Sequence, residues 1–274
     1  MYSRSILTFS FAVFIAFTAP ALAGNGVDGM VLVPEGEFLM GSTPEQVKKL
    51  KETFGKRDFY KNYSFDNEAP QKKVWLKALY IDRSEVTNAE YASFIKATSH
   101  TPPRSWINGK YANGKGKYPV LYVSQKDAKA YAKWCGKRLP TAIEWEKAAR
   151  GANGFVFPWG NEFDPYKAAT AEADLKLIFG ALCSVNSANM VGKAEGDVSP
   201  YGVHDMAGNV REWTSTHSAK DKTKVAVKGG SWLDLHVNAR AAHTEYVMAD
   251  GVSHIIGFRC VKDVDNVANG GFFK

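Results

Sequence analysis

Cysteine is scarce in this sequence, and its distribution excludes several common uses of the residue. The 274-residue chain contains three cysteines, Cys135, Cys183 and Cys260, with no CxxC pair and no zinc-type Cys/His spacing. Three thiols allow at most one disulfide and leave one cysteine over, so the chain is not a densely disulfide-bonded scaffold. The stretch from Gly229 to Arg259 contains no cysteine at all.

Long apolar stretches are also lacking, apart from one at the start of the chain. Residues 6–17 form an apolar run behind Arg4, and residues 21–23 (Ala-Leu-Ala) have the small-x-small pattern that signal peptidases read. The run is too short to span a bilayer comfortably. We expect residues 1–23 to be a signal peptide cleaved after Ala23, which places the mature protein in the periplasm or outside the cell. An uncleaved membrane anchor is the alternative.

Clustered charge of one sign is the third absence. The formal net charge is +7, but the lysines are mixed with acidic residues and form no basic stripe. This distribution argues against a nucleic-acid partner. No later stretch is apolar enough to span a membrane after signal cleavage. The remaining length suits one large domain with a sizeable core.

Four short helices are predicted in the first half of the chain, and short strands and turns in the second. Residues 44–54 have apolar side chains at helical spacing. Thr87, Ser124 and Thr141 are expected N-caps of three further helices, because each precedes a helical pattern. Helices come early and strands late, without βαβ alternation, so we predict a loop-rich α+β domain.

Eight segments resemble a known family, and they occur in the order that the family has. Together they cover nearly all of residues 30–261: MVLVPEGEFLMGS, YIDRSEVTNAEYASF, YPVLYVS, DAKAYAKWCGKRLPTAIEWEKAARG, FPWGNEFDP, YGVHDMAGNVREWT, KGGSW and GFRC. The ordered set is similar to the formylglycine-generating enzyme, or sulfatase-modifying-factor, family. The resemblance implies an α+β, C-type-lectin-like fold with low regular secondary structure. We place the domain at 30–262 and a short C-terminal tail at 263–274.

The family's oxidase chemistry lacks its ligands in this chain. The resemblance implies a copper ion held by two thiolates shortly after the GGS motif. Here the first position falls near Asp234 and the second within residues 236–240, and neither holds a cysteine. Copper(I) selects soft thiolate ligands, which an aspartate cannot replace. We therefore expect neither copper as a cofactor nor ordinary formylglycine generation.

The segment DMAGNVRE (residues 205–212) resembles the family's calcium loop. Calcium prefers carboxylate and carbonyl oxygen atoms. The resemblance implies side-chain ligands from Asp205 and Glu212, and carbonyl ligands from Gly208 and Val210. Calcium is thus the expected structural cofactor. In the alternative interpretation, Asp205 caps a turn and Glu212 pairs with an arginine.

Four of the six histidines lie late in the chain and raise the alternative of an iron or zinc site. Histidine and carboxylate side chains together are suitable ligands for these metals. Their spacing matches no ligand motif, which favours ordinary polar loop residues instead. The candidate ligands are His217, His236, His243, His254, Asp234 and Glu245.

A disulfide between Cys135 and Cys260 follows from the resemblance, because in the family the cysteine of GFRC pairs with one on the helix before GKRLPT. The matching helix position here is Ala132, and Cys135 lies one turn further along the same face. Two buried thiols are the alternative. Cys183 then remains unpaired.

Three functions remain open for the cleft expected around Ser231, Trp232, Asp234 and His236. The first is a binding or accessory module that recognises a protein or peptide in the exported compartment. The second is a non-copper oxidoreductase of the iron type, acting on a periplasmic protein, metabolite or siderophore. The third is a true formylglycine generator. Other tryptophans are expected in the core, whereas Trp232, directly after GGS, is a candidate for ligand contact.

Overall fold

The computed structural model describes residues 27–55, 65–172 and 187–264 of the chain. The expected signal peptide, Cys183 and most of the expected tail lie outside these ranges. Within them, no helix is long and apolar enough to cross a membrane.

Four α-helices form where the sequence predicts helical segments. They are α1 (Pro44–Phe54), α2 (Asn88–Thr98), α3 (Gln125–Trp134) and α4 (Ala142–Arg150). Each begins with a capping box, and the caps expected at Thr87, Ser124 and Thr141 are confirmed. In such a box the cap side chain and the third helical residue satisfy each other's free backbone N–H groups, which fixes the start of the helix.

The strands form three small sheets. The first has the order β1 (Met30–Val33), β4 (Leu79–Asp82), β9 (Val261–Asp263), and the second pairs β2 (Gly36–Met40) with β3 (Lys72–Leu76). The third has the order β7 (Glu245–Met248), β6 (Lys224–Lys228), β5 (Arg211–His217), β8 (Ile256–Gly257). Only β5 and β8 run parallel, and the other paired strands are antiparallel.

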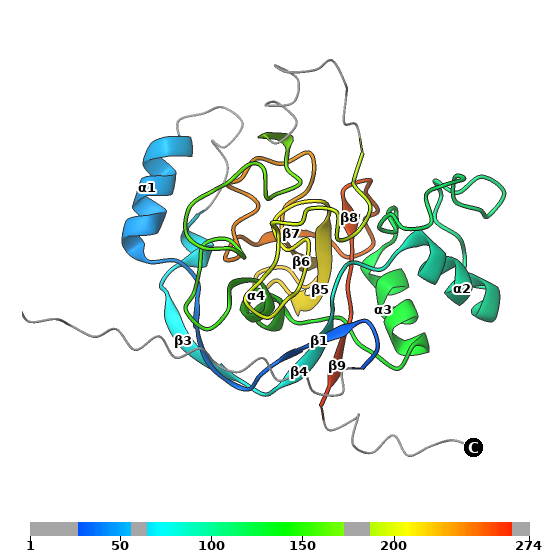
Figure 1. The fold of residues 1–274 in the computed structure, drawn as a ribbon, viewed down its shortest axis with the longest axis horizontal. Helices are drawn as coiled ribbons and strands as arrows, with labels where there is room; N and C mark the ends of the chain where they lie inside the picture. Colours follow the sequence, from blue (N-terminus) through cyan, green and yellow to red (C-terminus); the bar gives the residue numbers. More distant parts are fainter. Residues whose placement is uncertain (1–26, 56–64, 173–186, 265–274) are drawn as a thin grey trace, which may run out of the picture.

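The third sheet lies at the centre of the molecule, with α4 packed beside it (Figure 1). In the same view α1 lies at one side and α2 and α3 lie at the other. Trp145 of α4 and Trp213 of β5 are fully buried, as expected for core tryptophans, whereas the same expectation is wrong for Trp134, which is 42% exposed at the end of α3. Their indole N–H groups donate to Glu212 and to the Val123 carbonyl, so neither ring buries an unsatisfied donor.

The segment that follows β6 starts with two glycines that the packing requires. Gly229 and Gly230 have φ angles of +93° and +69°. A Cβ atom on Gly229 would lie 2.9 Å from the Trp145 ring, and one on Gly230 would lie 3.0 Å from the Ala239 backbone. The pair therefore turns the chain sharply over the core and fixes the position of Ser231.

Candidate functional site

Ser231 and Asp234 lie inside the fold, where a single arginine holds the turn together. Arg211 Nε and Nη2 donate to the two oxygen atoms of Asp234 at 2.8 and 2.6 Å. The Ser231 hydroxyl donates to Asp234 Oδ2 at 2.6 Å. Asp234 is 8% exposed and Ser231 is fully buried. Arg211 also pairs with Glu245 of β7.

This arrangement tests whether the segment could hold copper. Asp234 occupies the position expected for the first thiolate, and both of its oxygen atoms already accept hydrogen bonds from Arg211. A guanidinium in bidentate contact is a poor neighbour for a metal cation, because the two positive charges compete for one carboxylate. The residues present do not fit a thiolate-bound copper ion.

Trp232 faces a different environment from its neighbour Asp234. Its ring meets His254 edge-on, with 5.9 Å between the centroids. His254 lies 6.3 Å from the ring of Tyr122, over which Arg104 places its guanidinium at 5.2 Å. We call these four residues the Trp232 surface. The indole Nε1 of Trp232 is buried and has no hydrogen-bond partner among the residues that the structure describes.

His236 lines a separate cavity rather than the Trp232 surface. Its Nδ1 lies 2.5 Å from Glu172 Oε1, and its ring stacks on Phe163. Of the four residues of the expected cleft, His236 alone lines this cavity. Asp234, which is buried and bonded to Ser231, lies between Trp232 and His236 along the chain.

Glu212, at the end of the expected calcium loop, is completely buried against Arg259. Arg259 Nε and Nη2 donate to its carboxylate at 2.7 Å each, and Trp145 Nε1 donates at 2.8 Å. The expected alternative, an arginine partner for Glu212, is therefore what the structure contains. Gly208 has a φ angle of +135°, and a Cβ there would lie 2.4 Å from the Ala169 carbonyl oxygen. This backbone conformation and close approach require glycine at position 208.

Asp205, at the start of this loop, belongs to a buried acidic group. Glu85, Asp197 and Asp205 are at most 2% exposed, and Arg259 is the nearby cation. Burial raises the pKa of all three carboxyls. Glu85 Oε2 and Asp197 Oδ1 find no hydrogen-bond partner within the described ranges.

An excess of buried negative charge suits a cation near Asp205, but the carboxylate of Glu212 is already engaged. No group of three His, Cys, Asp or Glu side chains in residues 27–55, 65–172 and 187–264 is arranged to hold a metal ion. The calcium assignment stays a prediction that rests on Asp205 and on the carbonyl groups of Gly208 and Val210.

The late histidines are dispersed rather than gathered. His217 Nδ1 contacts the Lys222 carbonyl, and His243 is buried 3.6 Å from Glu68. His236 and His254 lie in the two environments described above. The described part of the chain therefore offers no observation in favour of the iron or zinc alternative.

Cys135 and Cys260 lie side by side as thiols. The hydrogen bond from Cys260 lowers the pKa of the Cys135 thiol, whereas burial raises the pKa of Cys260. Cys260 is fully buried and Cys135 is partly buried. The contact is consistent with both interpretations given above, and the disulfide stays a prediction.

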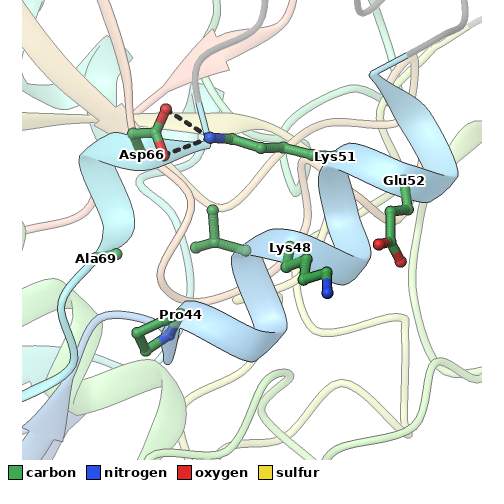
Figure 2. A pocket seen from close by; sticks show the side chains of 7 residues that line it. Pro44, Lys48, Lys51, Glu52, Asp66 and Ala69 are labelled. Atoms are coloured by element: carbon green, nitrogen blue, oxygen red, sulfur yellow. Dashed lines mark hydrogen bonds and ion pairs between the residues drawn. The ribbon is translucent and has the colours of Figure 1, made fainter.

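A second hollow, separate from the cavity that His236 lines, lies along α1 and has a volume of about 470 Å³ (Figure 2). Lys51 crosses it and places Nζ 2.6 and 2.8 Å from the two oxygen atoms of Asp66. Both side chains are at least half exposed, so the pair adds little stability. Because Lys51 and Asp66 neutralise each other's charge, this hollow is a weak candidate for a charged ligand.

The sequence does not identify three residues that contact the predicted site residues: Arg211, Glu172 and Arg259. Arg211 and Glu172 are separated from their partners by 23 and 64 residues, and no periodic pattern links them. One feature of the sequence indicates a role for Arg259, because it is the single charged residue of the GFRC segment. A charged residue in an otherwise apolar strand usually has a buried partner of opposite sign.

The loop-rich α+β fold and the GGS turn over a buried tryptophan define the class of protein to which this chain belongs. The family named for the sulfatase-modifying factor enzyme 1-like domain matches residues 17–264. The chain therefore belongs to the formylglycine-generating enzyme family, as the ordered motifs predicted.

Two curated relatives illustrate the range of the family. The formylglycine-generating enzyme of Streptomyces coelicolor is 31% identical, over 90% of this chain and 93% of its own length. The inactive C-alpha-formylglycine-generating enzyme 2 of Bos taurus is 30% identical, over 86% of this chain and 89% of its own. Similarity to both an enzyme and an inactive relative means that the family alone does not settle the activity.

Solved structures confirm the fold class. PvdO from Pseudomonas aeruginosa superposes with a TM-score of 0.66 at 25% identity, covering 86% of this chain and 94% of that one. CarF superposes with a TM-score of 0.57 at 21% identity, covering 86% and 98%. CarF supports the fold alone.

Proposed function

We propose that this protein is an exported binding or accessory module on the formylglycine-generating-enzyme fold, without the copper chemistry of the family. The observation that carries the proposal is the environment of Asp234. Where the family needs a free thiolate, this chain has a carboxylate whose two oxygen atoms are held by Arg211. The segment 229–259 has no cysteine to replace it.

The Trp232 surface is the part of the expected cleft that suits a peptide or protein partner. It combines two aromatic rings with exposed His254 and Arg104, and Leu233 beside it is 53% exposed. Aromatic side chains with polar ends, together with arginine, dominate binding energy at protein interfaces.

Backbone strain in the same surface supports a binding role. Tyr122 has a φ angle of +59°, a conformation that is uncommon for an aromatic residue. Its N–H donates to the Ser253 carbonyl at 2.9 Å, which joins it to the loop that carries His254. Strained residues concentrate at functional sites, where the surrounding structure holds them.

Site-specific cross-linking in the native host tests this proposal. A photoreactive benzophenone residue at position 232 should give a discrete protein adduct. The matched control is the same residue in place of Trp75, a tryptophan of β3 that is 55% exposed and lies outside the Trp232 surface. Equal labelling from both positions, or none from 232, would count against a partner at this surface.

Export is part of the proposal and has its own measurement. Mass analysis of the protein recovered from the periplasm or medium should find Gly24 as the first residue. A full-length chain that stays with the cytoplasmic fraction would contradict it.

A further inference from the structure

The cavity that His236 lines is separate from the Trp232 surface, and nothing in the proposed function uses it. It has a volume of about 640 Å³, within the range of small-molecule sites. Its wall includes Phe54 of α1, Phe157 and Phe163 of the following loops, and Glu172, His236 and Arg240. Three phenylalanine rings thus line the cavity together with several polar side chains, and Phe54 and Phe163 both contact the His236 ring.

Glu172 fixes His236 through two contacts. Glu172 Oε2 accepts a hydrogen bond from the His236 backbone N–H at 2.6 Å, and Oε1 lies 2.5 Å from Nδ1. Phe163 covers one face of the imidazole, with 4.7 Å between the centroids and 24° between the planes. The imidazole side chain keeps 30% of its surface exposed. Since Nδ1 is occupied, the edge that carries Nε2 is the polar part of the ring left for a ligand.

The contact with Glu172 also decides what Nε2 can do. An ionised carboxylate only accepts hydrogen bonds, so the Nδ1 atom facing it carries the proton. In a neutral imidazole the other nitrogen, Nε2, is then an acceptor. A ligand group that meets Nε2 must therefore donate a hydrogen bond.

The rings around His236 favour an aromatic ligand. Arg240 already donates from all three of its nitrogen atoms, because Nη1 and Nη2 donate to Glu68 and Nε donates to the Val237 carbonyl. Phe163 lies parallel to His236 and Phe54 meets it edge-on at 5.3 Å. Ring arrangements of these two kinds are the ones that aromatic ligands extend most favourably.

We propose that this cavity binds an aromatic ring that carries a hydrogen-bond donor, of the phenol type, with the hydroxyl donating to His236 Nε2. The ring packs among the phenylalanines, and Glu172 holds the imidazole in the accepting tautomer. A free phenolic molecule and the tyrosine side chain of a peptide share this chemistry. The proposal goes beyond the proposed function, because it concerns different residues and stands whether or not the Trp232 surface binds a partner.

Calorimetry with matched probes tests the hydrogen bond directly. We expect 4-methylphenol to bind at least about tenfold more tightly than 4-methylanisole, which has the same ring and an oxygen that only accepts. Equal affinities, or no binding of 4-methylphenol, would overturn the proposal. N-acetyltyrosinamide binding more tightly than 4-methylphenol points to a tyrosine of a peptide, and the reverse order points to a free phenolic molecule.

Two variants and one control locate the binding. His236→Phe keeps a ring but removes the acceptor, so the preference for phenol over anisole should disappear. Glu172→Gln should reduce the same preference, because an amide can donate to Nδ1 and allow the other tautomer. Lys48→Ala, in the second hollow of α1, should change neither affinity. A phenol preference that survives in His236→Phe would contradict the assignment.

Nitrogen-15 NMR of the unliganded protein measures the tautomer of His236 independently of ligand binding. At neutral pH the His236 ring should show the Nδ1–H tautomer, and Glu172→Gln should show a mixture. A predominant Nε2–H tautomer in the wild type would overturn the proposal even if a phenol binds.

Discussion

Two arginine-carboxylate pairs occupy the two segments in which the sequence predicts metal or ligand sites, and they have different consequences. Glu212 and Arg259 are both 0% exposed, in the middle of the core. Asp234 and Arg211 are nearly buried, at 8% and 13%, and lie beneath residues that reach the surface. The first pair fixes the core, whereas the second fixes a turn and leaves Trp232 and His236 available to ligands.

The comparison also shows how an arginine partner decides whether a carboxylate at a predicted ligand position is available to a metal ion. Around Arg259 there are more acidic groups than one guanidinium can neutralise, so a further cation remains chemically reasonable there. Around Asp234, Arg211 meets two carboxylates, which accept its donors without leaving an oxygen free for a metal. Spacing alone does not distinguish these two cases.

Loss of Arg259 should have the largest effect. Arg259→Met leaves Glu212 buried without its partner, which typically costs about 3–5 kcal/mol of the free energy of unfolding. Urea denaturation should show this loss, which is a large fraction of the total stability of a typical domain. The control Arg104→Ala, at the exposed end of the Trp232 surface, should stay within about 0.5 kcal/mol of wild type.

Calcium removal should have the next largest effect. A ligand present at one hundred times its dissociation constant adds about 2.7 kcal/mol to the native state. A chelator should therefore lower the melting temperature, and added calcium should restore it. Asp205→Asn should remove this response. A wild-type protein that is indifferent to the chelator would show that the acidic group around Asp205 binds no calcium.

Asp234→Ala should destabilise the protein by a smaller amount, about 1–3 kcal/mol. Arg211 keeps its contact with Glu245, so its charge is not left unpaired. Denaturant unfolding measures the loss, and Leu233→Ala is the neighbouring control, with little expected change because Leu233 is 53% exposed. If Asp234→Ala is as stable as wild type, the ion pair does not hold the turn.

The pH dependence of stability should have opposite signs around Glu68 and around Arg259. Burial favours the protonated form of Glu68, but the contact with His243 and the charge of Arg240 hold the pKa of Glu68 below its usual value. Burial likewise lowers the pKa of His243. A carboxyl group whose pKa is lower in the folded state stabilises the fold at pH values above its unfolded pKa. A histidine whose pKa is lower in the folded state reduces stability at pH values where the unfolded histidine binds a proton. The His243 effect reduces stability as the pH falls below about 6.5, and the Glu68 effect reduces it further below about 4.5.

The acidic group near Arg259 should act in the other direction. Burial raises the pKa of Glu85 and Asp197, so these carboxyls keep their protons in the folded state at pH values where the unfolded chain releases them. Stability from this region falls as the pH rises above about 4.5 in the absence of a cation. In melting curves across pH, Glu85→Gln should flatten the decline on the alkaline side alone, and His243→Gln the decline on the acid side alone. A common response of both variants would contradict this division.

The fold was predictable from the sequence to a large extent, and the site only in part. The capping boxes at Thr87 and Thr141 are local, and the ordered motifs carry the fold of the family. The Arg211–Asp234 and Glu172–His236 contacts join residues that are distant in the chain. Such contacts follow from tertiary packing rather than from a repeating pattern, so the sequence did not reveal that Asp234 is held by Arg211 or that His236 lines a cavity with Glu172.

The central claim is that the Asp234 segment holds an ion pair in place of a copper centre, and one measurement tests it most directly. The purified protein, loaded with copper, is incubated aerobically with a sulfatase-type peptide that contains cysteine, and the peptide is weighed by mass spectrometry. The account predicts an unchanged cysteine mass, because no thiolate lies in residues 229–259 to bind copper(I). Conversion of the cysteine to an aldehyde, dependent on Cys135, Cys183 or Cys260, would contradict it.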